Sequence, residues 1–233
     1  MIKGFSLLEL IIALTISVGV LTFVISSVSE STGYSGKVTA KQQGMEAIFH
    51  TMEMLRSDLT KCGMRLQEAA KFFNFPLFEN SDYSLKVTYG IESETLILDS
   101  HQGENIITIN RNEFFNSGKP VVIYDLEKEV YEINEVKGRD GDRLILVNIL
   151  QNDYPKNAAA VVLKQVEYKL YTQKDTNALK RKVNKGYFQP LAENVTDFYV
   201  KFYPEALTVF YRIEVNRRQQ LRGYIFLTNM VKR

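Results

Sequence analysis

Residues 1–30 form an apolar run that a single acid interrupts. Between Phe5 and Val28, Glu9 is the only charged side chain. A helix of about 24 residues rises roughly 36 Å, which is enough to cross the hydrocarbon core of a bilayer. A carboxylate inside such a segment costs about 2.5–3.5 kcal/mol on insertion scales. We therefore predict a transmembrane helix over residues 5–29, in which Glu9 has a functional role.

Beyond this run the apolar positions keep a helical period but lie along one side of the helix. They recur mostly at spacings of three and four, at Tyr34, Val38, Met45, Ile48, Met52, Leu55, Leu59, Cys62, Leu66, Ala69 and Phe73. This stripe predicts an amphipathic helix over residues 30–73. Gly63 favours a break followed by a short second helix, because glycine suits the left-handed residue after a helix. The stripe packs either on the chain's own sheet, which we favour, or on a coiled-coil partner.

From about residue 85 the apolar period changes to two. Short β-branched or aromatic runs alternate with turn residues, which predicts short strands at LKVTY, TLILD, IITIN, PVVIYDL, EVYEINEV and RLILVNIL. Longer strands are expected at 160–171, 194–203, 207–216 and 222–230. Asp140-Gly141 is a hairpin signal between two of these runs. The predicted fold class is α+β, shaped like a lollipop. A long N-terminal helix, half membrane segment and half amphipathic, packs on a mostly antiparallel sheet formed by residues 74–233.

Composition adds little catalytic chemistry to this picture. Among 233 residues the net charge is +2, and there are two histidines and one cysteine. A Cys/His metal cluster is therefore excluded, and neither His50 nor His101 has a partner at a catalytic spacing. We predict no enzyme activity, no cofactor and no metal. Cys62 cannot form an internal disulfide, so it is either a buried thiol, which we favour, or a cysteine that pairs between chains.

Two further patterns each allow a binding interpretation. The segment 138–142, Gly-Arg-Asp-Gly-Asp, hints at a calcium loop but lacks the ligand spacing of one, so we favour a plain hairpin turn. Basic residues cluster at Lys180, Arg181 and Lys182 and again at Arg217 and Arg218, with aromatic residues nearby in sequence. Basic and aromatic side chains together bind nucleic acid through phosphate charge and base stacking. Alternating charges on solvent-facing strand positions explain the same pattern, and we favour that interpretation.

The segment around Glu9 resembles a known processing motif. Lys3-Gly4-Phe5-Ser6-Leu7-Leu8-Glu9-Leu10 is similar to the motif of type IV prepilins and of type II secretion pseudopilins. The resemblance implies that a prepilin peptidase removes residues 1–4 as a leader, cutting after Gly4, and methylates the new amine of Phe5. It also implies that Glu9 guides stacking against other major and minor pilins. A conventional signal peptide, an ordinary membrane anchor and a buried soluble helix are the alternatives.

A looser resemblance covers the C-terminal region. The runs FFNSGKPVVIYD, VEYKLYTQKDTNALKRKV and QPLAENVTDFYVKFY look like those of large minor pilins of the PilW type and of J-type pseudopilins. This implies a low-abundance subunit that initiates or caps a pilus. Such a subunit crosses the cytoplasmic membrane once, with its C-terminal domain outside the cytoplasm. Lipid surrounds its N-terminal helix before assembly. A type II secretion pseudopilin and a tip adhesin or DNA-binding pilin are the alternatives. Major pilins usually carry a proline where this chain has Ser26, which favours a minor subunit.

Overall fold

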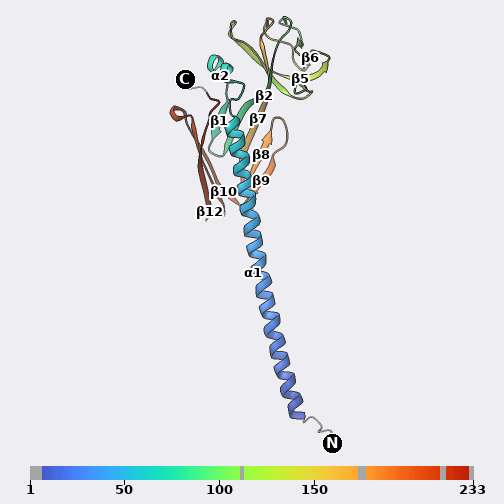
Figure 1. The fold of residues 1–233 in the computed structure, drawn as a ribbon, viewed down its shortest axis with the longest axis vertical. Coiled ribbons are helices and arrows are strands. Elements are labelled where there is room, and N and C mark those ends of the chain that lie inside the picture. The colour runs from blue at the N-terminus through green and yellow to red at the C-terminus, as the bar shows by residue number, and fades with distance from the viewer. Residues whose placement is uncertain (1–6, 111–112, 173–176, 216–218, 231–233) are drawn as a thin grey trace. The chain divides into compact units, whose positions relative to one another are not determined.

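The computed structural model describes residues 7–110, 113–172, 177–215 and 219–230, without the side chains of residues 7–13, 15, 30–41, 43 and 219. The chain divides into two compact units, Met1–Phe49 and His50–Arg233. Figure 1 shows the ribbon of both units, coloured along the chain. Each unit is described by itself below.

The first unit consists of the N-terminal part of helix α1, which spans Leu7–Lys61 and has 55 residues. Its apolar side chains point outward around the helix, and each is at least half exposed: Leu14, Ile16, Val18, Val20, Leu21, Phe23, Val24, Ile25 and Val28. No helix in the described part of the chain combines the length and the apolar composition that crossing a membrane requires.

Helix α1 ends where glycine predicts a break. It stops at Lys61, and a seven-residue helix α2 follows at Gln67–Phe73. Between them Gly63 has a φ of +76°, and its N–H donates to the carbonyl of Thr88 over 3.0 Å. A Cβ at this position would lie 2.8 Å from the carbonyl oxygen of Asn229. Both the left-handed backbone and the close approach therefore require glycine.

Most of the second unit is a nine-stranded antiparallel sheet. Its main path runs β1-β2-β7-β4-β5-β6-β3, while β8 pairs with β7 and β9 pairs with β8. The strands are β1 Phe78–Ser81, β2 Ser84–Thr95, β3 Ile106–Thr108, β4 Pro120–Asp125, β5 Val130–Asp140, β6 Arg143–Leu146, β7 Ala159–Thr172, β8 Asn177–Val183 and β9 Gln189–Glu193. The 14-residue β7 is central because one half pairs with β4 and the other half with β8.

A separate three-stranded sheet follows near the C-terminus. It contains β10 Val195–Tyr203, β11 Thr208–Val215 and β12 Gln219–Phe226, with the short 3-10 helix η1 Pro204–Ala206 between β10 and β11. The alternation expected for these strands is confirmed. Along β11 the residues Val209, Tyr211, Ile213 and Val215 are buried, while the residues between them are half-buried. One face of this sheet therefore packs inward and the other faces solvent.

Two buried clusters hold the second unit together. Along the last turns of α1 the stripe residues Leu55 and Leu59 are fully buried, as are Cys62, Leu66 and Ala69 after it. A second core lies under β3 to β7 and includes Ile107, Phe115, Val136, Leu146 and Val162. The stripe residues of this unit therefore pack on the chain itself, as the sequence favours over a coiled-coil partner.

The strand predictions were partly right. Asp140-Gly141 does form the hairpin turn between β5 and β6, with Gly141 at a φ of +59°. The run at 95–99 makes only an isolated bridge from Leu96 to Ile109. The strands β1 and β9 were not predicted, because they are short and carry few apolar residues. They extend sheets whose other strands supply the hydrophobic core.

The predicted α+β lollipop is therefore wrong as a description of this fold. We expected one C-terminal sheet with a long helix packed on it, whereas the described strands form two antiparallel sheets and dominate the second unit. Among the described residues of that unit, helical structure is limited to the last turns of α1, to α2 and to η1. The apolar half of α1, which was expected to be a membrane segment, does not qualify as a membrane-spanning helix among the described residues. The second unit is a mostly antiparallel β structure.

Candidate functional site: a buried carboxylate cluster and its surroundings

The most concentrated polar chemistry in the second unit is a cluster around Asp58, which we call the Asp58 cluster (Asp58, Tyr89, Tyr168 and Arg181). The Asp58 side chain is only 5% exposed. Tyr89 Oη donates to its Oδ1 over 3.1 Å, and Tyr168 Oη donates to its Oδ2 over 2.7 Å. Arg181 donates to the same Oδ2 from Nη2 over 2.8 Å and from Nε over 3.0 Å. These four side chains come from α1, β2, β7 and β8.

The electrostatics of the cluster keep both tyrosines protonated. Burial, reinforced by the charge of Asp58, raises the pKa of Tyr89 and of Tyr168 well above the usual value. Burial alone would lower the pKa of Arg181, but the Asp58 carboxylate and Tyr168 outweigh it and raise that pKa. The tyrosines therefore act as hydrogen-bond donors and the guanidinium as a permanent cation toward one carboxylate.

This arrangement fastens elements of the second unit together. Each Asp58 oxygen accepts at least one hydrogen bond, and the opposite charge is in contact. A buried carboxylate needs this degree of compensation because desolvating an unpaired charge is costly. The Asp58 cluster thus ties the end of α1 to three strands of the larger sheet.

The interpretation of Asp58 as one of the charged residues off the apolar stripe, together with Glu46, Glu53, Arg56 and Lys61, is wrong, because Asp58 is buried. Asp58 follows Leu55 by three residues and precedes Cys62 by four, so it lies at the spacing of the apolar stripe. An acid in such a position is buried if the helix packs, and it then needs partners. The partners come from strands 31, 110 and 123 residues further along the chain, which no local pattern could identify.

The predicted basic cluster on β8 is divided between two faces. Arg181 turns inward to Asp58. Lys180 places its ammonium 4.6 Å from the centre of the Tyr171 ring, and Lys182 forms an ion pair with Glu167 over 3.0 Å. The structure therefore brings Lys180 and Lys182 to an aromatic surface and gives Arg181 a different partner. Arg217 and Arg218 lie outside the described residues, so the predicted contact with nucleic acid stays a prediction.

The predicted processing and assembly residues lie at the margin of the described chain. Gly4 and Phe5 are outside the described residues. Glu9 lies within helix α1, but its side chain is not among those described. The roles assigned to these three residues therefore stay predictions.

Cys62 is a buried thiol, as the sequence favours. Its Sγ donates to the carbonyl of Leu77 over 3.3 Å, and burial raises its pKa to about 12, although the hydrogen bond with the Thr88 backbone lowers it slightly. The thiolate is the reactive form of cysteine. Cys62 therefore remains protonated at neutral pH and contributes to packing.

The histidines and the segment 138–142 show no metal-binding geometry. His101 lies 3.6 Å from a carboxylate oxygen of Asp153, and both side chains are well exposed. At the hairpin, Arg139 Nε donates to the carbonyl of Gly141 over 2.7 Å, so this carbonyl already has a cationic hydrogen-bond partner. Within the described ranges no group of three potential metal ligands occurs. These observations favour the hairpin turn over the calcium loop.

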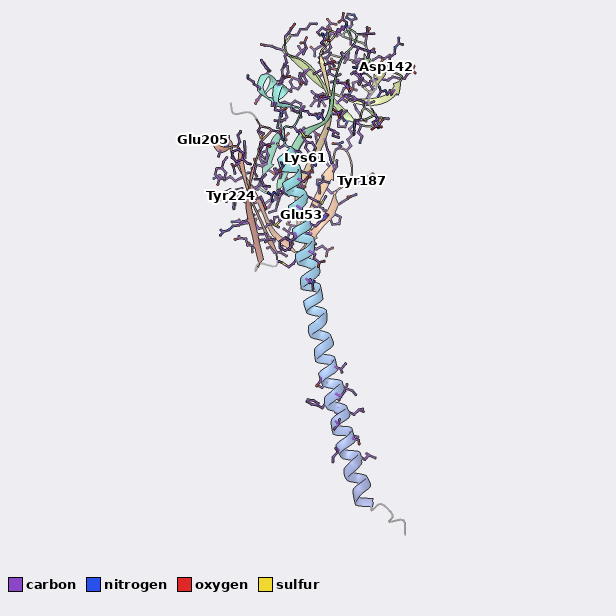
Figure 2. The ribbon with its side chains drawn as sticks, in the orientation of Figure 1. Glu53, Lys61, Asp142, Tyr187, Glu205 and Tyr224 are labelled. Atoms are coloured by element: carbon purple, nitrogen blue, oxygen red, sulfur yellow. The ribbon has the colours of Figure 1, made fainter. Side chains whose placement is uncertain are left out.

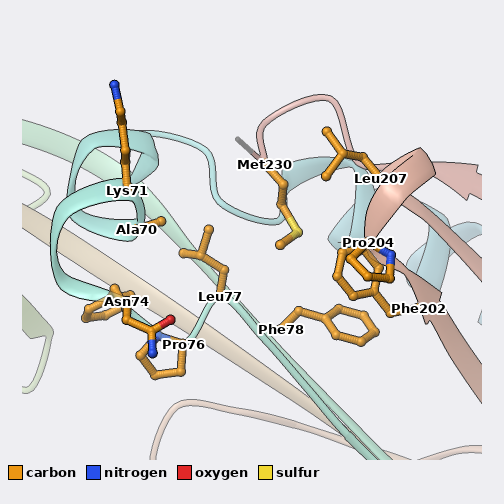
Figure 3. A pocket seen from close by; sticks show the side chains of 11 residues that line it. Ala70, Lys71, Asn74, Pro76, Leu77, Phe78, Phe202, Pro204, Leu207 and Met230 are labelled. Atoms are coloured by element: carbon orange, nitrogen blue, oxygen red, sulfur yellow. The ribbon is translucent and has the colours of Figure 1, made fainter. Parts of the chain in front are cut away.

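An apolar pocket lies between α2 and the end of β10 (Figure 3). It has a volume of about 710 Å³, and its walls include Leu77, Phe78, Phe202 and Met230. The side chain of Lys71 extends away from the hollow in Figure 3. The pocket offers shape and apolar surface, and no titratable group is directed into it from the residues that Figure 3 labels.

Comparison with known proteins does not add a family to these observations. No protein-family model matches the chain, and no curated protein matches it.

Proposed function

We propose that this chain is a minor subunit of a type IV pilus-like filament. In this proposal a prepilin peptidase cuts after Gly4, the new amine of Phe5 is methylated, and Glu9 guides assembly. The agreement of glycine, aromatic residue, acid and apolar run over residues 4–28 is the observation that carries it. Major pilins usually carry a proline where this chain has Ser26, and no proline occurs here before Pro76. The chain would therefore be a minor subunit, which helps to initiate or cap the filament.

The exposed apolar surface of α1 supports an assembly role. The side chains from Leu14 to Val28 that are named above are at least half exposed all around the helix. A helix that is apolar on every side needs an apolar environment, either neighbouring helices or lipid. In the proposal, lipid covers this surface before assembly and the helices of other pilins cover it afterwards.

A charged partner for Glu9 follows from the same chemistry. An α-amine at Phe5 would titrate near pH 8 and would be largely cationic at neutral pH. It would lie about one helical turn from Glu9 in the same chain, or it would meet Glu9 of a neighbouring chain. Such a pair is stronger in a low-dielectric bundle than at a surface, although desolvation offsets much of the gain.

The Asp58 cluster is consistent with a helix that transmits force. Within the second unit, α1 is tied to β2, β7 and β8 by a buried ion pair and two tyrosine hydrogen bonds. A filament subunit must keep its helix attached to its globular part when the filament is pulled. The proposed location is the cytoplasmic membrane, with the C-terminal domain outside the cytoplasm, and later the pilus.

Intact mass of the chain from membranes of its native host tests this proposal first. Loss of residues 1–4 together with the gain of one methyl group is the expected result. An uncut chain would contradict the proposal and indicate an ordinary anchor. Loss of the whole segment 1–30 would also contradict it, because a plain signal peptide would explain the apolar run.

Incorporation of Glu9→Ala into filaments tests the assembly role. We expect this variant to be processed and folded but absent from sheared filaments, because the charged partner is lost. Glu46→Ala is the matched control, since Glu46 is an exposed acid on the same helix. Normal incorporation of Glu9→Ala would show that Glu9 does not guide assembly.

A further inference from the structure

Strand β12 presents a free edge to solvent. It pairs with β11 in eight consecutive residue pairs, from Thr208 with Phe226 to Val215 with Gln219, without a register shift. In the described part of the chain, β11 is its only strand partner. A strand of this length with one open edge exposes a row of unpaired backbone groups.

The orientation of those backbone groups follows from one hydrogen bond. The N–H of Leu227 donates to the carbonyl of Leu207 over 2.7 Å. Because bonded pairs alternate along an antiparallel ladder, the N–H groups of Leu221, Gly223 and Ile225 also point to β11. The N–H and C=O groups of the four residues between them therefore point to the free edge: Gln220, Arg222, Tyr224 and Phe226.

The other sheet edges among the described strands are protected. Strands β1 and β3 have only four and three residues. Strand β9 carries Pro190, and its ladder with β8 contains a register shift. On the β10 edge, Asn80 Nδ2 donates to the carbonyl of Val200 over 3.3 Å. Short strands, proline, irregular register and side-chain cover are four means of blocking edge pairing, and none of the four is found among the described residues of β12, whose one charged residue is Arg222.

We propose that β12 pairs antiparallel with β12 of a second copy of this chain, with Gly223 on the two-fold axis. Arg222 then lies opposite Tyr224 of the copy, and Leu221 lies opposite Ile225. In this register the edge-facing residues Arg222 and Tyr224 form hydrogen-bonded pairs, as their N–H directions require. Two three-stranded sheets join into one of six strands. The inference is independent of the proposed filament function.

Side-chain chemistry favours a second copy over an unrelated strand. Pairing about Gly223 places Arg222 of one copy beside Tyr224 of the other on the solvent face. On the inner face it places Leu221 of one copy beside Ile225 of the other. The same sheet already contains this contact, because Tyr199 pairs with Arg212 and the guanidinium lies 5.3 Å from the ring centre. Tyr224 is 71% exposed and Phe226 is 61% exposed, so both have surface to bury. Figure 2 shows Tyr224 on the outer side of the sheet.

One cysteine added at a time, combined with a short bismaleimide, tests both the contact and its register in the full chain in detergent micelles. Residues 222 and 224 would each lie about 9 Å from their counterparts in the copy, whereas residue 220 would lie about 20 Å from its own. We expect cross-linked dimers from Arg222→Cys and from Tyr224→Cys. Gln220→Cys is the matched control on the same strand and face, and the wild-type chain controls for the buried Cys62. Gly223 is not replaced, because a Cβ there would lie 2.5 Å from Tyr211 Oη.

Either of two cross-linking results would overturn the proposal. If Gln220→Cys cross-links as well as the other two, the contact is not in this register. If none of the three variants cross-links to a second copy, β12 does not bind itself. The same conclusion holds if they capture only a different protein in native membranes.

A proline substitution separates backbone pairing from side-chain contact. In the Arg222→Cys chain, Tyr224→Pro removes an edge-facing N–H and leaves the ladder with β11 intact. We expect the cross-linked fraction to fall about tenfold, because two hydrogen bonds are lost per dimer. Tyr224→Ala keeps the N–H and should retain most of the dimer. Equal yields from the two variants, with unchanged near-ultraviolet circular dichroism, would contradict strand pairing.

Discussion

At the scale of single residues, Asp58 is the side chain whose burial has the largest consequences. It is a carboxylate inside an apolar helix stripe, and it is stable there because Arg181 and two tyrosines surround it. Buried ion pairs are weak contributors to net stability, yet breaking one leaves an unpaired charge. The cluster therefore specifies how the end of α1 packs on β2, β7 and β8.

Replacing Asp58 with Asn should strongly destabilise the second unit. The variant leaves the guanidinium of Arg181 without its counter-ion, and we expect a loss of about 3–5 kcal/mol in the free energy of unfolding. Thermal and denaturant unfolding, followed by near-ultraviolet circular dichroism of the tyrosines, measure it. Glu53→Gln is the control, because Glu53 is an exposed acid on the same helix (Figure 2). A loss as small as that of the control would show that the ion pair is not important for stability.

The raised pKa values of Tyr89 and Tyr168 predict alkaline sensitivity. A group whose pKa is raised on folding stabilises the folded state fully at any pH below the pKa that the group has in the unfolded chain. For a tyrosine this unfolded pKa is near 10. The stabilisation is lost as the pH rises from there toward the pKa of the folded state. The free energy of unfolding should start to decrease above about pH 9, because burial also raises the pKa of Cys62 to about 12, and the contribution of the two tyrosines starts near pH 10. Above about pH 10 the free energy of unfolding should decrease by about 1.4 kcal/mol per pH unit for each such tyrosine.

Tyr168→Phe tests this pH dependence. Removing one of the titrating groups should make the decrease above pH 10 less steep, although the variant also loses a hydrogen bond to Asp58 at every pH. Tyr187→Phe is the control, since Tyr187 is 94% exposed and should leave the slope unchanged. Unfolding curves collected between pH 8 and pH 11 compare the three chains. The same slope in Tyr168→Phe as in wild type would contradict this origin of the alkaline loss.

At the scale of elements, the break after α1 determines where the chain enters the sheet. Gly63 adopts a left-handed backbone conformation and approaches the carbonyl of Asn229, a residue beyond β12. The N–H of Gly63 also binds the carbonyl of Thr88 in β2. Gly63 thus binds β2 and lies close to the segment that follows β12.

Alanine substitutions at Gly44, inside α1, and at Gly63, just after its end, should have opposite effects. Gly63→Ala forces a Cβ to within 2.8 Å of the Asn229 carbonyl at a positive φ, and we expect a loss of at least about 1–2 kcal/mol. Gly44→Ala meets nothing within 4 Å in the helix interior and should raise helix stability by about 0.5–1 kcal/mol. Unfolding midpoints and far-ultraviolet circular dichroism measure both. Equal effects of the two substitutions would contradict a special role for Gly63.

At the scale of the whole molecule, the two units differ in how they bury apolar surface. In the second unit, buried side chains from α1 and the strands form its core. In the first unit the described apolar residues from Leu14 to Val28 are exposed. The first unit therefore needs a covering that its own residues do not supply, whereas the second has the composition of an independent domain.

Residues 50–233 should accordingly fold without the first unit. We expect this fragment to remain soluble without detergent and to unfold cooperatively, because the two buried clusters described above and the Asp58 cluster lie within it. The full chain should need detergent or lipid, since its exposed apolar surface promotes aggregation. Light scattering and thermal unfolding of both chains provide the comparison. A fragment that precipitates or lacks a cooperative transition would show that the first unit is required for folding.

Local patterns were sufficient wherever the cause of a structure is local. The stripe from Leu55 to Ala69, the break at Gly63, the Asp140-Gly141 turn and the alternation in β11 could all be read from the sequence, because each depends on neighbours within one or two turns. The burial of Cys62 followed from the same stripe. For residues 1–30 the sequence determined the apolar run and the position of Glu9, which together carry the proposed processing and assembly.

The tertiary structure alone decided how the strands are grouped and which polar groups meet. Two sheets in place of one, the partners of Asp58 and the separation of Arg181 from Lys180 depend on pairings between residues far apart in the chain, which local periodicity does not encode. The free edge of β12 is a property of the same kind, because an edge is defined by the strand that is missing beside it. Side-chain alternation shows which face of a strand is buried but not which strand lies next to it, and that choice belongs to the packing of the whole domain.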